Sequence, residues 1–149
     1  MRQPQYFPFR FAAAYRLPAL LFGITSATTG VWIDETMLRI RFGPWRLHTP
    51  LTNVISTTHT GPYAMVKTAG PAHLSLADRG LTYATNNERG LCIRFRQPVA
   101  GIEPLGLLRH PAVTVTVADC HGLARALNPS SLGRLLRRRH RHRKTRPIG

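Results

Sequence analysis

Strict alternation of apolar and polar residues over short segments is the feature that most constrains the fold of this chain. Residues 37–42 read Met-Leu-Arg-Ile-Arg-Phe, and similar alternation recurs in residues 45–48, 91–96 and 113–117. A period of two is typical of a β-strand with one buried and one solvated face. Turn residues separate such segments at intervals of about 8–12 residues, as in small all-β domains. We therefore expect residues 31–117 to be mainly antiparallel strand.

One helix is predicted after the strands. Asp119 is a suitable N-cap, and Leu123 and Leu127 follow it on one side, so we expect a helix over residues 119–127. Asn128-Pro129 ends the helix, because the residue before a proline avoids the helical conformation. Many strands followed by one terminal helix favour a mainly β fold, which we expect to be a small bent-sheet barrel with a C-terminal helix.

Three regions are expected along the 149 residues. Residues 1–16 form an aromatic and proline-rich N-terminal arm, in which Phe7, Phe9 and Phe11 allow a short edge strand. Residues 17–128 form the domain, and residues 129–149 form a basic tail that we expect to be disordered. The apolar run 17–24 contains Pro18 and is much shorter than the ~20 residues of a membrane-spanning helix, so no span is expected.

The phase of the alternation predicts which side chains point inward and which point outward. Each of three predicted strands has arginines at outward positions, and these form the candidate binding residues of the domain: Arg39, Arg41, Arg46, Arg94 and Arg96. The side chains of opposite phase are expected in the core: Leu38, Ile40, Phe42, Trp45, Leu47, Ile93 and Phe95. An ordinary solvated surface is the preferred explanation of these arginines, because binding requires the three strands to be neighbours. Residues 37–48 are expected to form a hairpin, which would make two of the strands neighbours.

The charge is strongly basic and unevenly distributed. The chain has 21 basic and 6 acidic residues, for a net charge of +15. The tail has no acidic residue and carries eight basic ones, which are further candidate binding residues: Arg134, Arg137, Arg138, Arg139, Arg141, Arg143, Lys144 and Arg146. Such a tail attracts an anionic lipid surface, an acidic protein surface or nucleic acid. A solvating tail without a dedicated partner is the alternative.

No signature of catalysis or of metal binding is present. The chain lacks the serine-hydrolase, zinc-protease and dinucleotide-binding motifs, and its seven histidines have no zinc-site spacing. The adjacent Cys120 and His121 are the candidate nucleophile and base, although adjacent residues rarely form such a pair. We therefore expect no enzyme activity, no cofactor and no metal. With two cysteines and no disulfide pattern, the expected location is cytoplasmic or peripheral at the inner face of the membrane.

A set of short strings distributed over residues 9–127 suggests a family. These are Leu38–Arg46 (LRIRFGPWR), Thr49-Pro50-Leu51, Asn53-Val54, Thr60-Gly61-Pro62-Tyr63, Gly70-Pro71, Leu74–Thr85 (LSLADRGLTYAT), Arg109-His110-Pro111 and Thr114–Ala118. Together they resemble small actinobacterial proteins of unknown function that carry a bacterial pleckstrin-homology-like domain. The resemblance implies a bent seven-stranded sheet closed at one corner by the C-terminal helix. It implies no catalytic residue and does not cover the tail.

The sequence thus favours a non-catalytic binding or scaffolding module that engages a protein or an anionic membrane surface. The alternative is a nucleic-acid-associated protein whose tail contacts phosphates without sequence preference. An enzyme that uses Cys120 is the third hypothesis. The sequence leaves the oligomeric state open.

Overall fold

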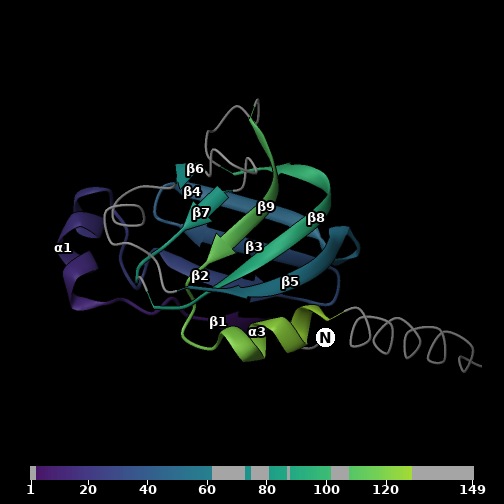
Figure 1. Cartoon of the computed structure of the whole chain (residues 1–149), viewed down its shortest axis with the longest axis horizontal. Helices are drawn as coiled ribbons and strands as arrows, with labels where there is room; N and C mark the ends of the chain where they lie inside the picture. The colour runs from purple at the N-terminus through teal and green to yellow at the C-terminus, as the bar shows by residue number, and fades with distance from the viewer. Residues whose placement is uncertain (1–2, 62–72, 75–80, 87, 102–107, 129–149) are drawn as a thin grey trace, which may run out of the picture.

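The computed structural model describes residues 3–61, 73–74, 81–86, 88–101 and 108–128. The domain is mainly β, as the sequence predicts, and its strands form two sheets (Figure 1). The strands of the first sheet are all antiparallel and lie in the order β1 (Gln5–Phe7), β2 (Thr29–Ile33), β3 (Met37–Phe42) and β4 (Trp45–Pro50). Short turns join β2 to β3 and β3 to β4, whereas a longer segment that contains a helix joins β1 to β2.

The second sheet has a less regular strand order. Its strands lie in the order β5 (Val54–Thr60), β8 (Gly90–Ala100), β9 (Arg109–Val115), β7 (Leu81–Tyr83) and β6 (His73–Leu74). Strand β7 pairs with β9 in parallel, whereas the other pairs are antiparallel. The expectation of antiparallel strands is therefore met except between β7 and β9.

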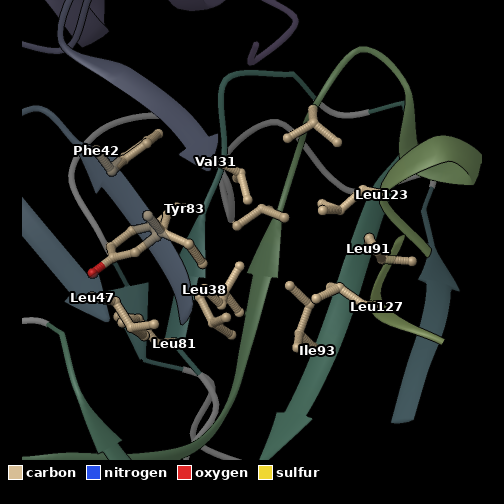
Figure 2. Packing of buried hydrophobic residues seen from close by; sticks show 14 of the residues in the cluster. Val31, Leu38, Phe42, Leu47, Leu81, Tyr83, Leu91, Ile93, Leu123 and Leu127 are labelled. Atoms are coloured by element: carbon tan, nitrogen blue, oxygen red, sulfur yellow. The ribbon is translucent and has the colours of Figure 1, made fainter. Parts of the chain in front are cut away.

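The two sheets face each other across one core. Figure 2 shows Val31, Leu38 and Phe42 of the first sheet directed toward Tyr83 and other side chains of the second. The rings of Phe42 and Tyr83 stack with their centroids 4.9 Å apart. Six of the seven expected core residues are buried, while Trp45 is only partly buried and packs against the edge of the core. The inward phase predicted from the sequence is therefore correct on β3, β4 and β8.

The expected barrel is not closed, because the chain turns a corner between β4 and β5. The short 3₁₀ helix η1 (Leu51–Asn53) separates these strands, and β5 pairs with β8 instead of β4. The Asn53 side chain bridges the corner, since its Nδ2 donates to the Gln97 carbonyl (2.9 Å) and its Oδ1 accepts from the Gln97 N–H (2.8 Å). A side-chain amide thus occupies the hydrogen-bonding groups that a neighbouring strand would use.

Strand β9 contains a proline although it lies inside the sheet. The β8–β9 register shifts between Arg94 and Val99, where the partners on β9 are Ala112 and His110. Pro111 lies within this irregularity, which tolerates a residue without an N–H group. On the other side of β9, strand β7 pairs only from Val113 onward, so Pro111 removes no regular ladder bond on that side either.

The N-terminal residues are part of the packed domain. Strand β1 is an edge strand, and the Phe9 side chain is buried in the core. The Arg10 carbonyl accepts hydrogen bonds from the side chains of Thr85 (2.7 Å) and Asn86 (2.9 Å), which are both buried. Helix α1 (Ala13–Leu21) follows and crosses the boundary expected between residues 16 and 17.

Helix α1 was not predicted, for two physical reasons. Pro18 lies inside it and cannot donate the N–H that a helix interior normally uses. Its N-cap residue, Ala12, offers no side-chain hydrogen bond, so the usual start signal is missing. The helix instead depends on tertiary packing of Tyr15 and Ala19, which are both buried.

The C-terminal helix α3 (Cys120–Leu127) confirms the prediction for residues 119–127 within one residue. The Asp119 side chain accepts a hydrogen bond from the N–H of Gly122 (2.8 Å) and thereby caps the helix. Leu123 and Leu127 are fully buried and pack against the inner face of the second sheet (Figure 2).

Candidate anion-binding face

The candidate face is the outer surface of the first sheet near the β3–β4 turn. Strand pairing places Arg41 of β3 directly opposite Arg46 of β4, and Gly30 of β2 on the other side of Arg41. Directly opposed residues have Cβ atoms about 4.5–5.5 Å apart. The side chains of two arginines therefore leave the sheet next to each other near one of its ends.

Neither charge of this pair is neutralised by a described carboxylate. Among the described residues, ion pairs join Arg10 to Glu88 (3.0 Å) and Arg39 to Asp34 (3.3 Å), and neither involves Arg41 or Arg46. The Nε of Arg41 is buried and has no hydrogen-bond partner in the described part of the chain. Opposed like charges destabilise a sheet. An anion between the two guanidinium groups would remove that repulsion.

Arg39 lies on the same face but has a different environment. Its guanidinium is paired with Asp34, whose carboxylate closes the β2–β3 turn by accepting from the N–H groups of Thr36 (2.9 Å) and Met37 (2.8 Å). The hydrogen bond from the Thr36 N–H is the main cause that lowers the pKa of Asp34. The hydrogen bond from Met37 and the charge of Arg39 lower this pKa further, whereas desolvation raises it. Arg39 therefore belongs structurally to this turn more than to the Arg41–Arg46 pair.

Arg94 and Arg96 are exposed, as predicted, but lie on β8 in the second sheet. Both sheets direct their apolar side chains to the same core, so their outer faces point away from each other. The cross-strand neighbours of Arg94 are the uncharged Ser56 and Ala112. The structure thus separates the five arginines into two groups, because β3 and β4 are neighbours in the first sheet and β8 belongs to the second.

The basic tail lies outside the described residues. The candidate positions there are Arg134, Arg137, Arg138, Arg139, Arg141, Arg143, Lys144 and Arg146.

Two aromatic rings lie on the same face as the arginines. Tyr6 and Trp32 are cross-strand partners, and their ring centroids are 5.1 Å apart. The rings cover the backbone of Gly30, where an added Cβ would come within 2.5 Å of the Tyr6 ring and 2.7 Å of the Trp32 ring. Gly30 is therefore needed for this close approach. Tyr6 is 48% exposed, and Trp32 lies directly opposite Arg39.

Cys120 and His121 do not form a catalytic pair. The thiol of Cys120 is buried and contacts the Val117 carbonyl (3.4 Å), and burial is the main cause that raises its pKa. The exposed His121 ring instead packs against His59 of β5, with centroids 4.5 Å apart. A raised thiol pKa disfavours the nucleophilic thiolate. Among the described residues, no group of three or more histidine, cysteine or acidic side chains could hold a metal ion.

The sequence prediction missed one surface feature, which is the apolar side of α1. Leu17, Leu20 and Leu21 are 71%, 59% and 80% exposed, and Phe22 just after the helix is 44% exposed. The length of the apolar run 17–24 excludes a membrane span but does not by itself indicate a surface helix. The helical spacing of Tyr15 and Ala19, one turn apart, is the signal that could have revealed it. Of the helices within the described residues, none is long and apolar enough to cross a membrane.

No family model matches this sequence, and neither the curated proteins nor the solved structures contain a significant match to it.

Proposed function

We propose that this protein is a non-catalytic binding module that engages an anionic surface through the outer face of its first sheet, with the basic tail adding electrostatic attraction. The observation that carries this proposal is the opposed Arg41–Arg46 pair, which lacks a described counter-ion. Arginine is well suited to such a role, because its planar guanidinium group donates to phosphate or carboxylate oxygens in pairs. The eight basic tail residues extend the attraction without requiring a defined geometry.

We also propose that the domain is a variant of the pleckstrin-homology-like fold. Two sheets around one core and a C-terminal helix packed against the second sheet support this assignment. The parallel pairing of β7 with β9 and the open corner at η1 are the features in which this chain differs from the expected bent antiparallel barrel.

A matched pair of variants tests the proposed function in the full chain. We expect the Arg41→Gln and Arg46→Gln double variant to bind phosphatidylglycerol-containing vesicles less tightly at moderate salt. The Arg94→Gln and Arg96→Gln variant loses the same charge from the other sheet and is the control. If both variants lose binding equally, net charge alone explains the attraction and the proposed face is wrong.

Nucleic acid is the second candidate partner, and the Tyr6–Trp32 pair is the observation that favours it. Exposed aromatic rings beside arginines can stack on the bases of a single strand. The same two double variants, titrated with single-stranded DNA over a salt series, test this alternative. Stacking predicts that Trp32→Leu weakens DNA binding at a salt concentration where phosphate contacts are screened. An unchanged affinity would exclude the stacking role.

A further inference from the structure

Helix α1 has an inverted amphipathic pattern. Its core contacts come from Tyr15 and Ala19, whereas Leu17, Leu20 and Leu21 are largely exposed. At 100° per residue, these three leucines lie on the side of the helix opposite to the buried pair. A surface helix normally directs leucines to the core and polar residues to solvent. A contiguous exposed apolar face of this kind marks an interaction site.

The apolar face lies at the same end of the first sheet as the arginine pair. The segment after α1 contacts the β3–β4 turn, because the Gly43 N–H donates to the Thr28 carbonyl (2.9 Å). A Cβ on Gly43 would come within 2.8 Å of the Ile24 side chain. Arg41 and Arg46 form the second cross-strand pair from this turn, after Phe42 and Trp45. Figure 1 shows α1 at the end of the sheet toward which β3 runs.

The charges of the described residues around this end are complementary to an anionic bilayer. Residues 1–33 contain no aspartate or glutamate, and Arg16 is an exposed residue of α1 itself. Asp34 and Glu35 lie at the other end of the first sheet, in the β2–β3 turn, and Glu88 is already paired with Arg10. Positive charge beside an exposed apolar helix is the combination that interfacial membrane helices use.

We propose that α1 inserts its leucine face into the surface of an anionic lipid bilayer while Arg41 and Arg46 contact the lipid phosphates. This inference rests on the proposed function and specifies its partner as a membrane. A helix of nine residues is about 14 Å long, which suits a helix lying in the interface. Pairing with a second copy through α1 would bring the arginine pairs of both chains together, whereas lipid phosphates neutralise them.

Vesicle binding by the full chain is the first test. We expect the Leu17→Gln and Leu21→Gln double variant to have a partition coefficient at least about tenfold lower for mixed phosphatidylglycerol–phosphatidylcholine vesicles. The reason is that two leucines lose their apolar contact with the bilayer. Ile55→Gln is the matched control, because Ile55 is also exposed (48%) but lies on β5 in the other sheet. The loss should persist at high salt, where electrostatic attraction is screened.

Depth of insertion is the second test. A tryptophan placed at residue 21 (Leu21→Trp) should be quenched by phosphatidylcholine brominated on its acyl chains, beyond the quenching of the native tryptophans. Ile55→Trp should show no added quenching. Absence of added quenching in Leu21→Trp would overturn the inference.

The outcomes separate this inference from the proposed function. If the Arg41→Gln and Arg46→Gln variant loses vesicle binding while the leucine variant binds normally, the inference is wrong and the proposed function stands. If neither variant changes binding, both are wrong. If the leucine variant converts a dimer to a monomer, as measured by light scattering, and leaves vesicle binding unchanged, the leucine face is a self-association surface and the inference is overturned.

Discussion

Because Arg41 and Arg46 lie opposite each other, we expect a substitution that removes their repulsion to stabilise the fold and to weaken binding to an anionic surface. The strand register places the two arginines opposite each other and neither has a described counter-ion, so we expect their like charges to repel in the free protein. Replacing Arg46 by glutamate converts a repulsive cross-strand pair into an attractive one. Each such pair is worth roughly 0.2–1 kcal/mol, so the reversal should stabilise the fold by about 0.5–1 kcal/mol for groups that reach solvent. The corresponding rise in melting temperature is about 2–5 °C for a domain of this size.

The assay is thermal unfolding at low and at high salt, combined with vesicle binding. Arg94→Glu is the control, because it makes the same change in net charge opposite the uncharged Ser56 and Ala112. We expect Arg46→Glu to be more stable than Arg94→Glu at low salt, with a difference that shrinks as salt screens the pair. The same variant should bind anionic vesicles less tightly. If both variants have equal stability at low salt, the two guanidinium groups do not repel each other and the reasoning is refuted.

Three further predictions concern the core and the tail. Phe95→Ala should destabilise the fold by about 3–5 kcal/mol in denaturant unfolding, because Phe95 is 4% exposed within the core; a loss below about 1 kcal/mol would contradict its inward phase. Tyr83 is buried and donates to the Gly101 carbonyl, and desolvation raises its pKa above the usual value of about 10. Folding therefore favours the neutral form of Tyr83, so its contribution to stability is complete below pH ~10 and declines at higher pH. Tyr83→Phe should remove this alkaline decline at the cost of one buried hydrogen bond. An unchanged pH profile of stability in Tyr83→Phe would contradict the raised pKa. Deleting residues 130–149 should leave the melting temperature nearly unchanged but reduce binding to anionic vesicles or DNA at low salt, because eight basic residues are lost; unfolding of the truncated chain would show that the tail supports the domain.

Local sequence patterns were sufficient to predict the buried faces of individual strands and the position of the C-terminal helix. Alternation in residues 37–42 and 91–96 decided which side chains of β3 and β8 are buried, since a strand directs successive side chains to opposite faces. Asp119 and the leucines that follow it determined α3 in the same way, because a cap and a one-sided apolar spacing are both local. The outward direction of Arg41 and Arg94 was predictable for the same reason.

Only the tertiary structure decided which of these faces lie together. A period of two tells which way a side chain points but not which strand is its neighbour. The hairpin expected over residues 37–48 brings Arg41 beside Arg46, whereas the strand order of two sheets separates both from Arg94. Helix α1 is the clearest case, because Pro18 and the missing cap oppose it locally while burial of Tyr15 and Ala19 stabilises it. Its leucines are exposed because those two residues, and not the leucines, meet the core. Long-range packing outweighs a local preference when the apolar area that it buries is worth more than the lost local hydrogen bonds.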